Sequence, residues 1–91
     1  MWETADPKGR PVVLEWTGWV HILRRHSDLD VTPHEIVDVV ARPDEHLRGR
    51  GDNEEWFYRR GRGPSAWIRV VVHYESGRGL IVTAFPRRSI P

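Results

Sequence analysis

The segment Ala66–Phe85 constrains the fold more than any other part of the chain. It reads AWIRVVVHYESGRGLIVTAF, two runs rich in β-branched and aromatic residues on either side of a short connector that contains two glycines. This pattern predicts a β-hairpin whose loop requires positive φ angles. We expect the hairpin to lie at the centre of a sheet.

The alternation of side chains along the hairpin predicts one buried and one functional face, because successive residues of a strand point to opposite sides. The residues predicted to face the core are Ile68, Val70, Val72, Leu80, Val82 and Ala84. The opposite face should carry a cation, a histidine and a hydroxyl, namely Arg69, His73 and Thr83. A sheet with one covered face and one face free for function follows from this pattern.

Two helices are predicted before the hairpin. Apolar residues recur at helical spacing between Trp16 and His26, which predicts a helix over Gly18–His26. The second helix is marked by Thr32-Pro33-His34-Glu35, which combines a capping box with proline in the first turn, and it should end at Arg42, before Pro43. Both helices are expected to pack on the apolar face of the sheet.

The other segments complete the expected fold. We predict a loosely ordered terminus over residues 1–10, an edge strand over Pro11–Glu15, a mobile loop over residues 44–53, a strand over Glu54–Arg60 and a turn over Gly61–Ser65. The expected fold class is α+β, with two N-terminal helices packed on one face of a three- to four-stranded antiparallel sheet. Residues 1–91 should form a single domain.

Charge is divided unevenly along the chain. Residues 1–46 include five basic and nine acidic residues, whereas residues 47–91 include nine basic and four acidic ones. Arginine binds phosphate bidentately and stacks on bases, so an arginine-rich half with interleaved aromatic residues is compatible with RNA binding. The predicted RNA-binding residues are Arg25, Arg60, Arg69, His73 and Arg87.

Composition excludes several classes of site. The chain has no cysteine, which rules out disulfides, thiol nucleophiles and zinc sites built on thiolates, and which suits a reducing cytoplasm. No apolar run approaches the ~20 residues of a membrane span, and the N-terminus lacks a signal core, so we predict a cytoplasmic protein without a membrane segment. The five histidines do not show metal-binding spacing, so no metal and no cofactor is predicted.

The remaining polar residues suit acid/base chemistry on a phosphodiester. Histidine titrates near neutral pH, arginine stabilises developing phosphate charge, and a hydroxyl can orient either group. Each candidate also has a purely structural interpretation. His26 can be a buried histidine at a helix end, His21 a solvated residue, Arg59 an ion-pair partner of Glu54 or Glu55, and Thr83 a residue of high β-propensity.

Several short segments, in this order and spacing, resemble the phage-type branch of the superfamily that groups barnase, EndoU, colicin tRNases and RelE toxins. The segments are Trp19–Ile22, Arg25-His26, Ile36, Arg42-Pro43-Asp44, Trp56–Arg59, Arg69–Val72 and Val82–Phe85. The resemblance implies N-terminal helices on a four-stranded antiparallel sheet and a metal-independent endoribonuclease, often a toxin paired with an inhibitor (antitoxin or immunity) protein. By this resemblance His21, His26, Arg59 and Thr83 fall on the recurrent polar positions of the family, with Tyr58 beside them, and these five residues are the catalytic candidates.

A second hypothesis belongs to a different functional class. The chain could be a non-catalytic binding module, such as an inactive relative, that recognises RNA or a protein through Trp2, Trp56 and Trp67. Aromatic residues and arginine are also enriched at protein interfaces, so the same side chains serve both hypotheses. Cleavage of RNA in the presence of a chelator discriminates between them. Composition and motifs leave the oligomeric state open.

Overall fold

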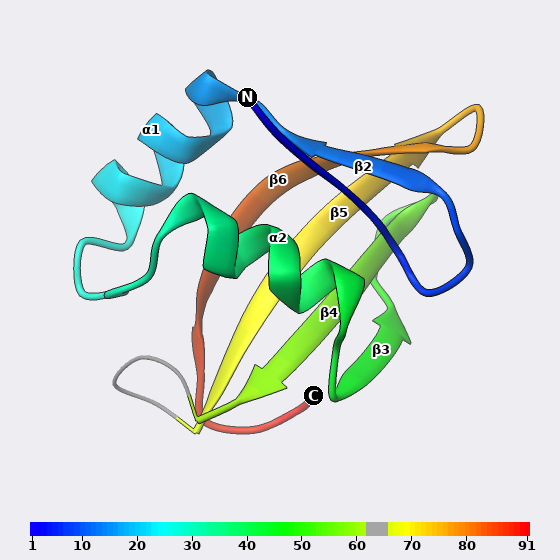
Figure 1. The fold of residues 1–91 in the computed structure, drawn as a ribbon. Coiled ribbons are helices and arrows are strands. Elements are labelled where there is room, and N and C mark those ends of the chain that lie inside the picture. Colours follow the sequence, from blue (N-terminus) through cyan, green and yellow to red (C-terminus); the bar gives the residue numbers. More distant parts are fainter. Residues whose placement is uncertain (62–65) are drawn as a thin grey trace.

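The computed structural model describes residues 1–61 and 66–91 and shows two helices and a six-stranded sheet (Figure 1). Across the sheet the strands follow the order β1-β2-β6-β5-β4-β3. Neighbouring strands are antiparallel except β2 and β6, which are parallel. The elements in chain order are β1 (Trp2–Ala5), β2 (Pro11–Leu14), α1 (Trp16–Arg25), α2 (Pro33–Ala41), β3 (Glu45–Arg48), β4 (Glu54–Arg60), β5 (Trp67–Glu75) and β6 (Arg78–Arg87).

This architecture corrects the expected fold. The sheet is mixed and has six strands instead of three or four, and the helices follow β1 and β2 instead of opening the chain. The sequence pattern predicted neither β1 nor β3, because both are four-residue strands without a β-branched run; they form by pairing with β2 and β4. Strand β2 was predicted at an edge but lies between β1 and β6. Of the turn predicted over residues 61–65, only Gly61 belongs to the described residues.

The central hairpin is confirmed. Strands β5 and β6 are joined at Ser76 and Gly77, whose φ angles are 53° and 77°. Two consecutive positive φ values define a type I′ turn, the connection whose twist matches that of the flanking strands. The tight turn fixes the register of the two longest strands, and therefore fixes which side chains lie opposite one another.

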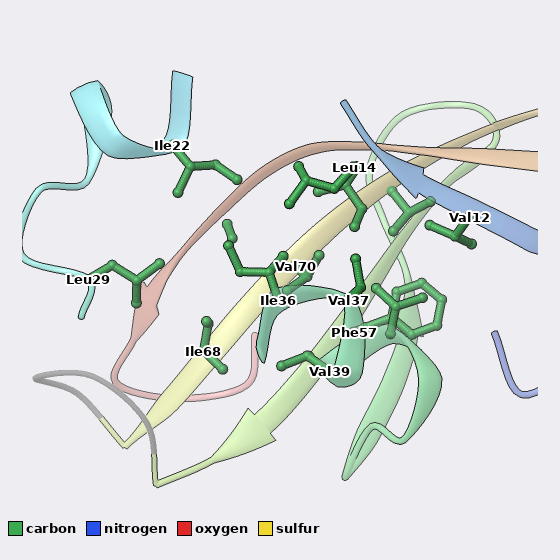
Figure 2. Packing of buried hydrophobic residues seen from close by; sticks show 14 of the residues in the cluster. Val12, Leu14, Ile22, Leu29, Ile36, Val37, Val39, Phe57, Ile68 and Val70 are labelled. Atoms are coloured by element: carbon green, nitrogen blue, oxygen red, sulfur yellow. The ribbon is translucent and has the colours of Figure 1, made fainter. Parts of the chain in front are cut away.

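Helix α2 is confirmed together with its capping box. The Thr32 hydroxyl accepts a hydrogen bond from the Glu35 amide at 3.2 Å, and the Glu35 carboxylate accepts one from the Thr32 amide at 3.2 Å. The helix crosses one face of the sheet and buries its apolar side there (Figure 2). The buried residues of this side are Ile36, Val37, Val39 and Val40.

Helix α1 lies beside β6 (Figure 1). Strand β2 pairs only with Gly79 and Leu80 of β6. The remaining length of this edge of β6 has no strand partner and lies next to α1. Close approach is possible at Gly18, where an added Cβ would lie only 3.3 Å from the Leu14 side chain and 3.4 Å from the Ile81 carbonyl oxygen. The C-terminal end of α1 is thereby brought to the outer edge of β6.

A β-bulge in β6 corrects part of the predicted core. Val71 pairs with Thr83 while Val72 pairs with Ile81, so Val82 is an extra residue that shifts the alternation. Ile81 is consequently buried, whereas Leu80 and Val82 are 39% and 46% exposed, and their predicted burial is wrong. The other residues predicted to face the core, Ile68, Val70, Val72 and Ala84, are buried as expected.

Candidate functional site

Nine side chains of the strands β4, β5 and β6 lie in consecutive rows on the sheet face opposite α2, and we call this part of the sheet the aromatic face. The strand register aligns these side chains in three rows, each with one residue from each strand. Aromatic and arginine residues make up the second and third rows, whereas the first row ends in the hydroxyl of Thr83. The rows are Trp56, Val71 and Thr83; Tyr58, Arg69 and Phe85; and Arg60, Trp67 and Arg87.

Arg69 occupies the centre of the aromatic face and is only 7% exposed. Its Cζ lies 3.8 Å from the ring centroid of Trp56 and 5.3 Å from those of Tyr58 and Phe85. Its Nε donates a hydrogen bond to the Tyr58 hydroxyl at 2.7 Å. Burial lowers the pKa of the guanidinium, and no carboxylate among the described residues forms an ion pair with it. Arg69 is therefore a buried cation whose charge is balanced by no anion in the described part of the chain.

Two more polar atoms of the same face lack partners. Within residues 1–61 and 66–91, the Thr83 hydroxyl and the Nε of Arg87 are buried and form no hydrogen bond. Two further cations, Arg87 and Arg50, lie close enough to lower the pKa of Arg69, after the larger effect of burial. The face thus gathers positive charge, and two of its polar atoms are buried without a hydrogen-bond partner in the described residues.

His26 borders the aromatic face from the end of α1. Its backbone amide caps the helix by donating to the Ile22 carbonyl at 2.9 Å, and its ring stacks on Phe85 with centroids 5.3 Å apart. Burial lowers the pKa of the imidazole; nearby Asp28 opposes this change and Arg25 adds to it. The ring is therefore neutral near pH 7 and able to accept a proton.

The other helical candidates lie elsewhere on α1. His21 and Arg25 are exposed and line a hollow of about 500 Å³ on the outer side of the helix, together with Trp16 and Arg24. His73 lies on the same side of β5 as Arg69, one row beyond Val71, and is exposed. Only His26, among the histidines of the described residues, has a ring contact with the aromatic face.

Arg59 lies on the opposite side of β4 from Tyr58. Its Nη1 contacts the Asp38 carboxylate at 3.2 Å, its Nη2 donates to the Asp38 carbonyl at 3.0 Å, and its Nε donates to the Arg42 carbonyl at 3.1 Å. These contacts tie the strand to the end of α2. The structure therefore places Tyr58, Arg69 and Thr83 on one face of the sheet, with His26 beside it through Phe85, and Arg59 on the opposite face.

One polar cluster was missed by sequence reasoning. Arg10 forms a bidentate ion pair with Glu55 at 2.7 and 2.8 Å and a further pair with Asp6 at 2.7 Å. His46 contacts Glu55 at 2.6 Å, and the Tyr74 hydroxyl donates to Asp6 at 2.7 Å. Glu55 and Tyr74 lie far in sequence from Arg10 and Asp6, so no local spacing reveals their contacts. The only local signal is Asp6-Pro7-Lys8-Gly9, a turn pattern that would have predicted the β1–β2 hairpin.

Comparison with known proteins gives no match: no family model, no curated protein and no solved structure matches the chain. In the described residues, neither helix combines the length and the apolar character needed to cross a membrane. The same residues contain no group of three or more histidine, cysteine or acidic side chains arranged to hold a metal ion. Because no relative guides the choice of a site, the aromatic face is chosen as the candidate site from the contacts of the described residues alone.

Proposed function

We propose that this chain is a metal-independent endoribonuclease that acts on RNA held against the aromatic face. One observation carries the proposal: a histidine kept neutral by burial, His26, adjoins through Phe85 a face whose central cation has no carboxylate partner in the described residues. A neutral imidazole is a proton acceptor, and unpaired arginines stabilise an anionic phosphorane. Both functions are needed for cleavage of RNA without a protein nucleophile.

The proposed reaction is an internal transfer. The ribose 2′ oxygen attacks the adjacent phosphorus while His26 takes the 2′ hydroxyl proton. The bond between phosphorus and the 5′ oxygen of the next nucleotide breaks, and that oxygen leaves with a proton from solvent. The products are a 2′,3′-cyclic phosphate and a free 5′ hydroxyl, so no oxidant, metal or covalent enzyme intermediate is required.

The polar residues on this side of the sheet have separate roles in the proposal. Arg69 and Arg87 stabilise the negative charge that develops on the phosphate, and Thr83 orients the phosphate group. Tyr58 holds Arg69 in place through the 2.7 Å hydrogen bond to Nε. Arg60, whose Cζ lies 4.4 Å from the Trp67 ring centroid, and the exposed His73 extend the surface available to the RNA.

The resemblance to the ribonuclease-toxin superfamily is a further support, since two of its four recurrent polar positions, His26 and Thr83, lie beside or on the aromatic face; the other two, His21 and Arg59, do not. On that basis we propose a toxin that acts in the cytoplasm and is held in check by an inhibitor protein. This part of the proposal is tested in cells: induction of the wild-type chain should arrest growth and degrade RNA, whereas induction of His26→Ala should do neither.

The biochemical test uses purified protein, RNA and an excess of chelator. Cleavage should persist in the chelator, yield 2′,3′-cyclic phosphate ends, and fail on RNA whose 2′ oxygens are methylated. Binding of the methylated RNA should weaken steeply between ~50 and ~200 mM salt, because each neutralised phosphate releases counterions. Unmodified RNA that stays intact under all conditions would exclude the nuclease.

A second candidate is a non-catalytic module that binds RNA or a protein. Cleavage normally uses an acid as well as a base. Among the described histidines only His26 has a ring contact with the aromatic face, and the lack of a second such histidine favours the binding module. In that case RNA or protein binds without being cut, and His26→Ala leaves the affinity unchanged.

A further inference from the structure

We propose that the outer side of helix α1 is a self-complementary surface through which two copies of the chain associate about a two-fold axis. The contact is formed by one row of side chains, Trp16, Val20 and Arg24, packed antiparallel against the same row of the second copy. In this arrangement Trp16 of one copy meets Arg24 of the other, and the two Val20 side chains lie at the axis. The proposal uses no residue of the aromatic face and does not depend on RNA cleavage.

Helix α1 lies outside β6, at the margin of the molecule, so one of its sides faces solvent (Figure 1). Its inner side is marked by the buried Ile22 and by Gly18, which closely approaches β6. Val20 is two residues from each of them, about 160° away around a helix of 3.6 residues per turn. Trp16 and Arg24 lie four residues before and after Val20 and therefore share its outward direction.

The outer row has an exposed apolar end. Trp16 is 63% exposed, although it stacks on Trp2 with ring centroids 6.1 Å apart, so its indole still has free surface. Leu23, which lies beside the row, is 46% exposed. Exposed large apolar residues that gather on one element are typical of protein interfaces, in which tryptophan and arginine are enriched.

The charged residues of the helix supply the complement. Arg24 and Arg25 in the last turn and Glu15 at the N-cap are all exposed, and none of them forms an ion pair within residues 1–61 and 66–91. One end of the helix therefore carries a carboxylate and an indole, and the other end carries two cations. An antiparallel second copy places each end against the kind of group that attracts it, because cations attract both carboxylates and aromatic rings.

The same charges favour a second copy over an acidic partner. RNA or a strongly acidic protein would match Arg24 and Arg25, but Glu15 would repel it at the end that carries Trp16. A second copy meets no such conflict, because its arginines lie opposite Glu15 and Trp16. Both halves of the surface are then satisfied at once.

Helix packing provides a geometry for this contact. Residues spaced by four form a ridge, and two helices whose ridges interlock cross at about −50° with about 8 to 10 Å between their axes. The outer row is such a ridge, and the hollow of about 500 Å³ beside it can receive the ridge of the second copy. An antiparallel contact also brings each helix N-terminus near the C-terminus of the other helix, where the two dipoles attract. By symmetry the contact between Trp16 and Arg24 occurs twice.

The first test measures the mass of the wild-type chain by sedimentation between ~1 μM and ~1 mM, since a contact of one short helix per copy is small and dissociates on dilution. We expect monomers at the low end and dimers at the high end. Trp16→Ala and Arg24→Ala should each weaken association at least tenfold, because each removes both symmetry-related contacts. Arg78→Ala is the control, since Arg78 is exposed next to the β5–β6 turn, away from α1 (Figure 1). It should associate like the wild type.

Two results of this test would overturn the proposal. One is a wild-type chain that stays monomeric at the highest concentration, which would leave the surface to a different protein or to RNA. The other is an Arg24→Ala chain that associates as well as the wild type. Urea unfolding of each variant checks that it is folded.

A mixture of the two variants gives the sharpest prediction. Trp16→Ala and Arg24→Ala chains each lose both contacts in their own dimers. A mixed dimer keeps one contact, because the chain that retains Trp16 meets the chain that retains Arg24. With one variant labelled isotopically, native mass spectrometry should therefore show more mixed dimer than random pairing gives. A random share or less would refute the antiparallel arrangement.

A cross-link tests the position of the axis and traps even a weak dimer. The chain has no cysteine, so a single introduced cysteine can bond only to its own copy. A disulfide requires two Cα atoms within about 7 Å, which Val20 satisfies only if it lies at the axis. Oxidised Val20→Cys should become a covalent dimer, whereas Glu75→Cys, at an exposed position at the end of β5, should stay monomeric. If Val20→Cys stayed monomeric, or if both variants cross-linked equally fast, the helices would not meet at Val20.

Discussion

The imidazole of His26 lies against the phenyl ring of Phe85, with ring centroids 5.3 Å apart and ring planes inclined by 29°. Phe85 stands directly opposite Arg69 in the register of β5 and β6. The contact therefore joins the end of α1 to the central row of the aromatic face. It exists because β2 pairs only with Gly79 and Leu80, which leaves the outer edge of β6 to the helix.

Replacing His26 should abolish RNA cleavage without abolishing binding. A general base contributes about 10² to 10⁴ in rate, so His26→Ala should lose activity by that factor while its affinity for 2′-O-methylated RNA stays within a few-fold. His21→Ala is the matched control, because His21 belongs to the same helix and faces the hollow on its outer side. Initial rates on a short labelled RNA measure both. A His21 variant as damaged as the His26 variant would show that the base is wrongly assigned.

The pH dependence of stability should also report His26. Burial lowers the pKa of this imidazole below its ordinary value of 6.5, so the unfolded chain binds the proton more readily than the folded one. Stability should therefore rise with pH up to about 6.5 and then level off. Urea unfolding at about pH 5 and about pH 8 should show a smaller change for His26→Gln than for the wild type. An identical change in both proteins would mean that His26 titrates freely.

Arg59→Met should affect stability and leave cleavage nearly unchanged. Arg59 binds Asp38 and the carbonyl oxygens at the end of α2, on the sheet side opposite Tyr58. Its loss should cost about 1 to 2 kcal/mol, discounted because both charges are partly exposed and Asp38 keeps Arg42 as a partner. Urea unfolding gives the cost, and cleavage rates should stay within a few-fold. A hundredfold loss of rate would return Arg59 to the reaction.

Elements with strong local signals could be predicted from the sequence. Thr32-Pro33-His34-Glu35 specifies the start of α2 by hydrogen bonds within four residues, and the observed capping box forms as expected. Gly77 and the connector around it specify the β5–β6 turn in the same way. Alternation also predicted the burial of Ile68, Val70 and Val72, but the expectation that the other face of β5 is free is wrong in the middle of the strand, where Arg69 and Val71 are buried too.

Features that depend on distant pairing could not be predicted. In Leu80–Phe85 nearly every residue is apolar, so the bulge at Val82, which exchanges Leu80 for Ile81 in the core, leaves no mark in the pattern. For the same reason the sequence could not show which of Arg59 and Arg69 is paired with a carboxylate. Alternation places both on strands, but only the packing of α2 against β4 shows that Arg59 is neutralised by Asp38 while Arg69 is not.

The bulge predicts a contrast between two valines of the hairpin. Val70 is 0% exposed under α2, so Val70→Ala should cost about 1 to 3 kcal/mol through lost methyl burial and a residual cavity. Val82 protrudes at the bulge, and Val82→Ala should cost less than about 0.5 kcal/mol. Urea unfolding of the two variants decides the point. Equal losses would place Val82 in the core after all.

The ion pair between Arg10 and Glu55 should dominate acid stability at the other end of the sheet. Hydrogen bonds from Arg10 are the largest cause of the lowered pKa of Glu55; burial opposes them, and His46 adds to the lowering. A carboxyl with a depressed pKa contributes stability that is present above its ordinary pKa of 4.5 and is lost as pH falls through the folded value. Asp6 acts in the same direction, since hydrogen bonds from Tyr74 and Arg10 outweigh the effect of burial on its pKa.

Glu55→Gln should therefore lower the free energy of unfolding by about 2 to 3 kcal/mol near neutral pH, because Arg10 loses one of its two carboxylates in a partly buried site. The difference from the wild type should shrink as the pH is lowered, because protonation removes the same charge from the wild-type protein. Glu54→Gln is the control: Glu54 accepts a hydrogen bond from the Trp56 indole at 2.6 Å, and a glutamine keeps that acceptor. Urea unfolding across the acid range compares the two. If both variants were equally stable at neutral pH, the network would be a set of surface contacts that does not hold the β1–β2 hairpin on the sheet.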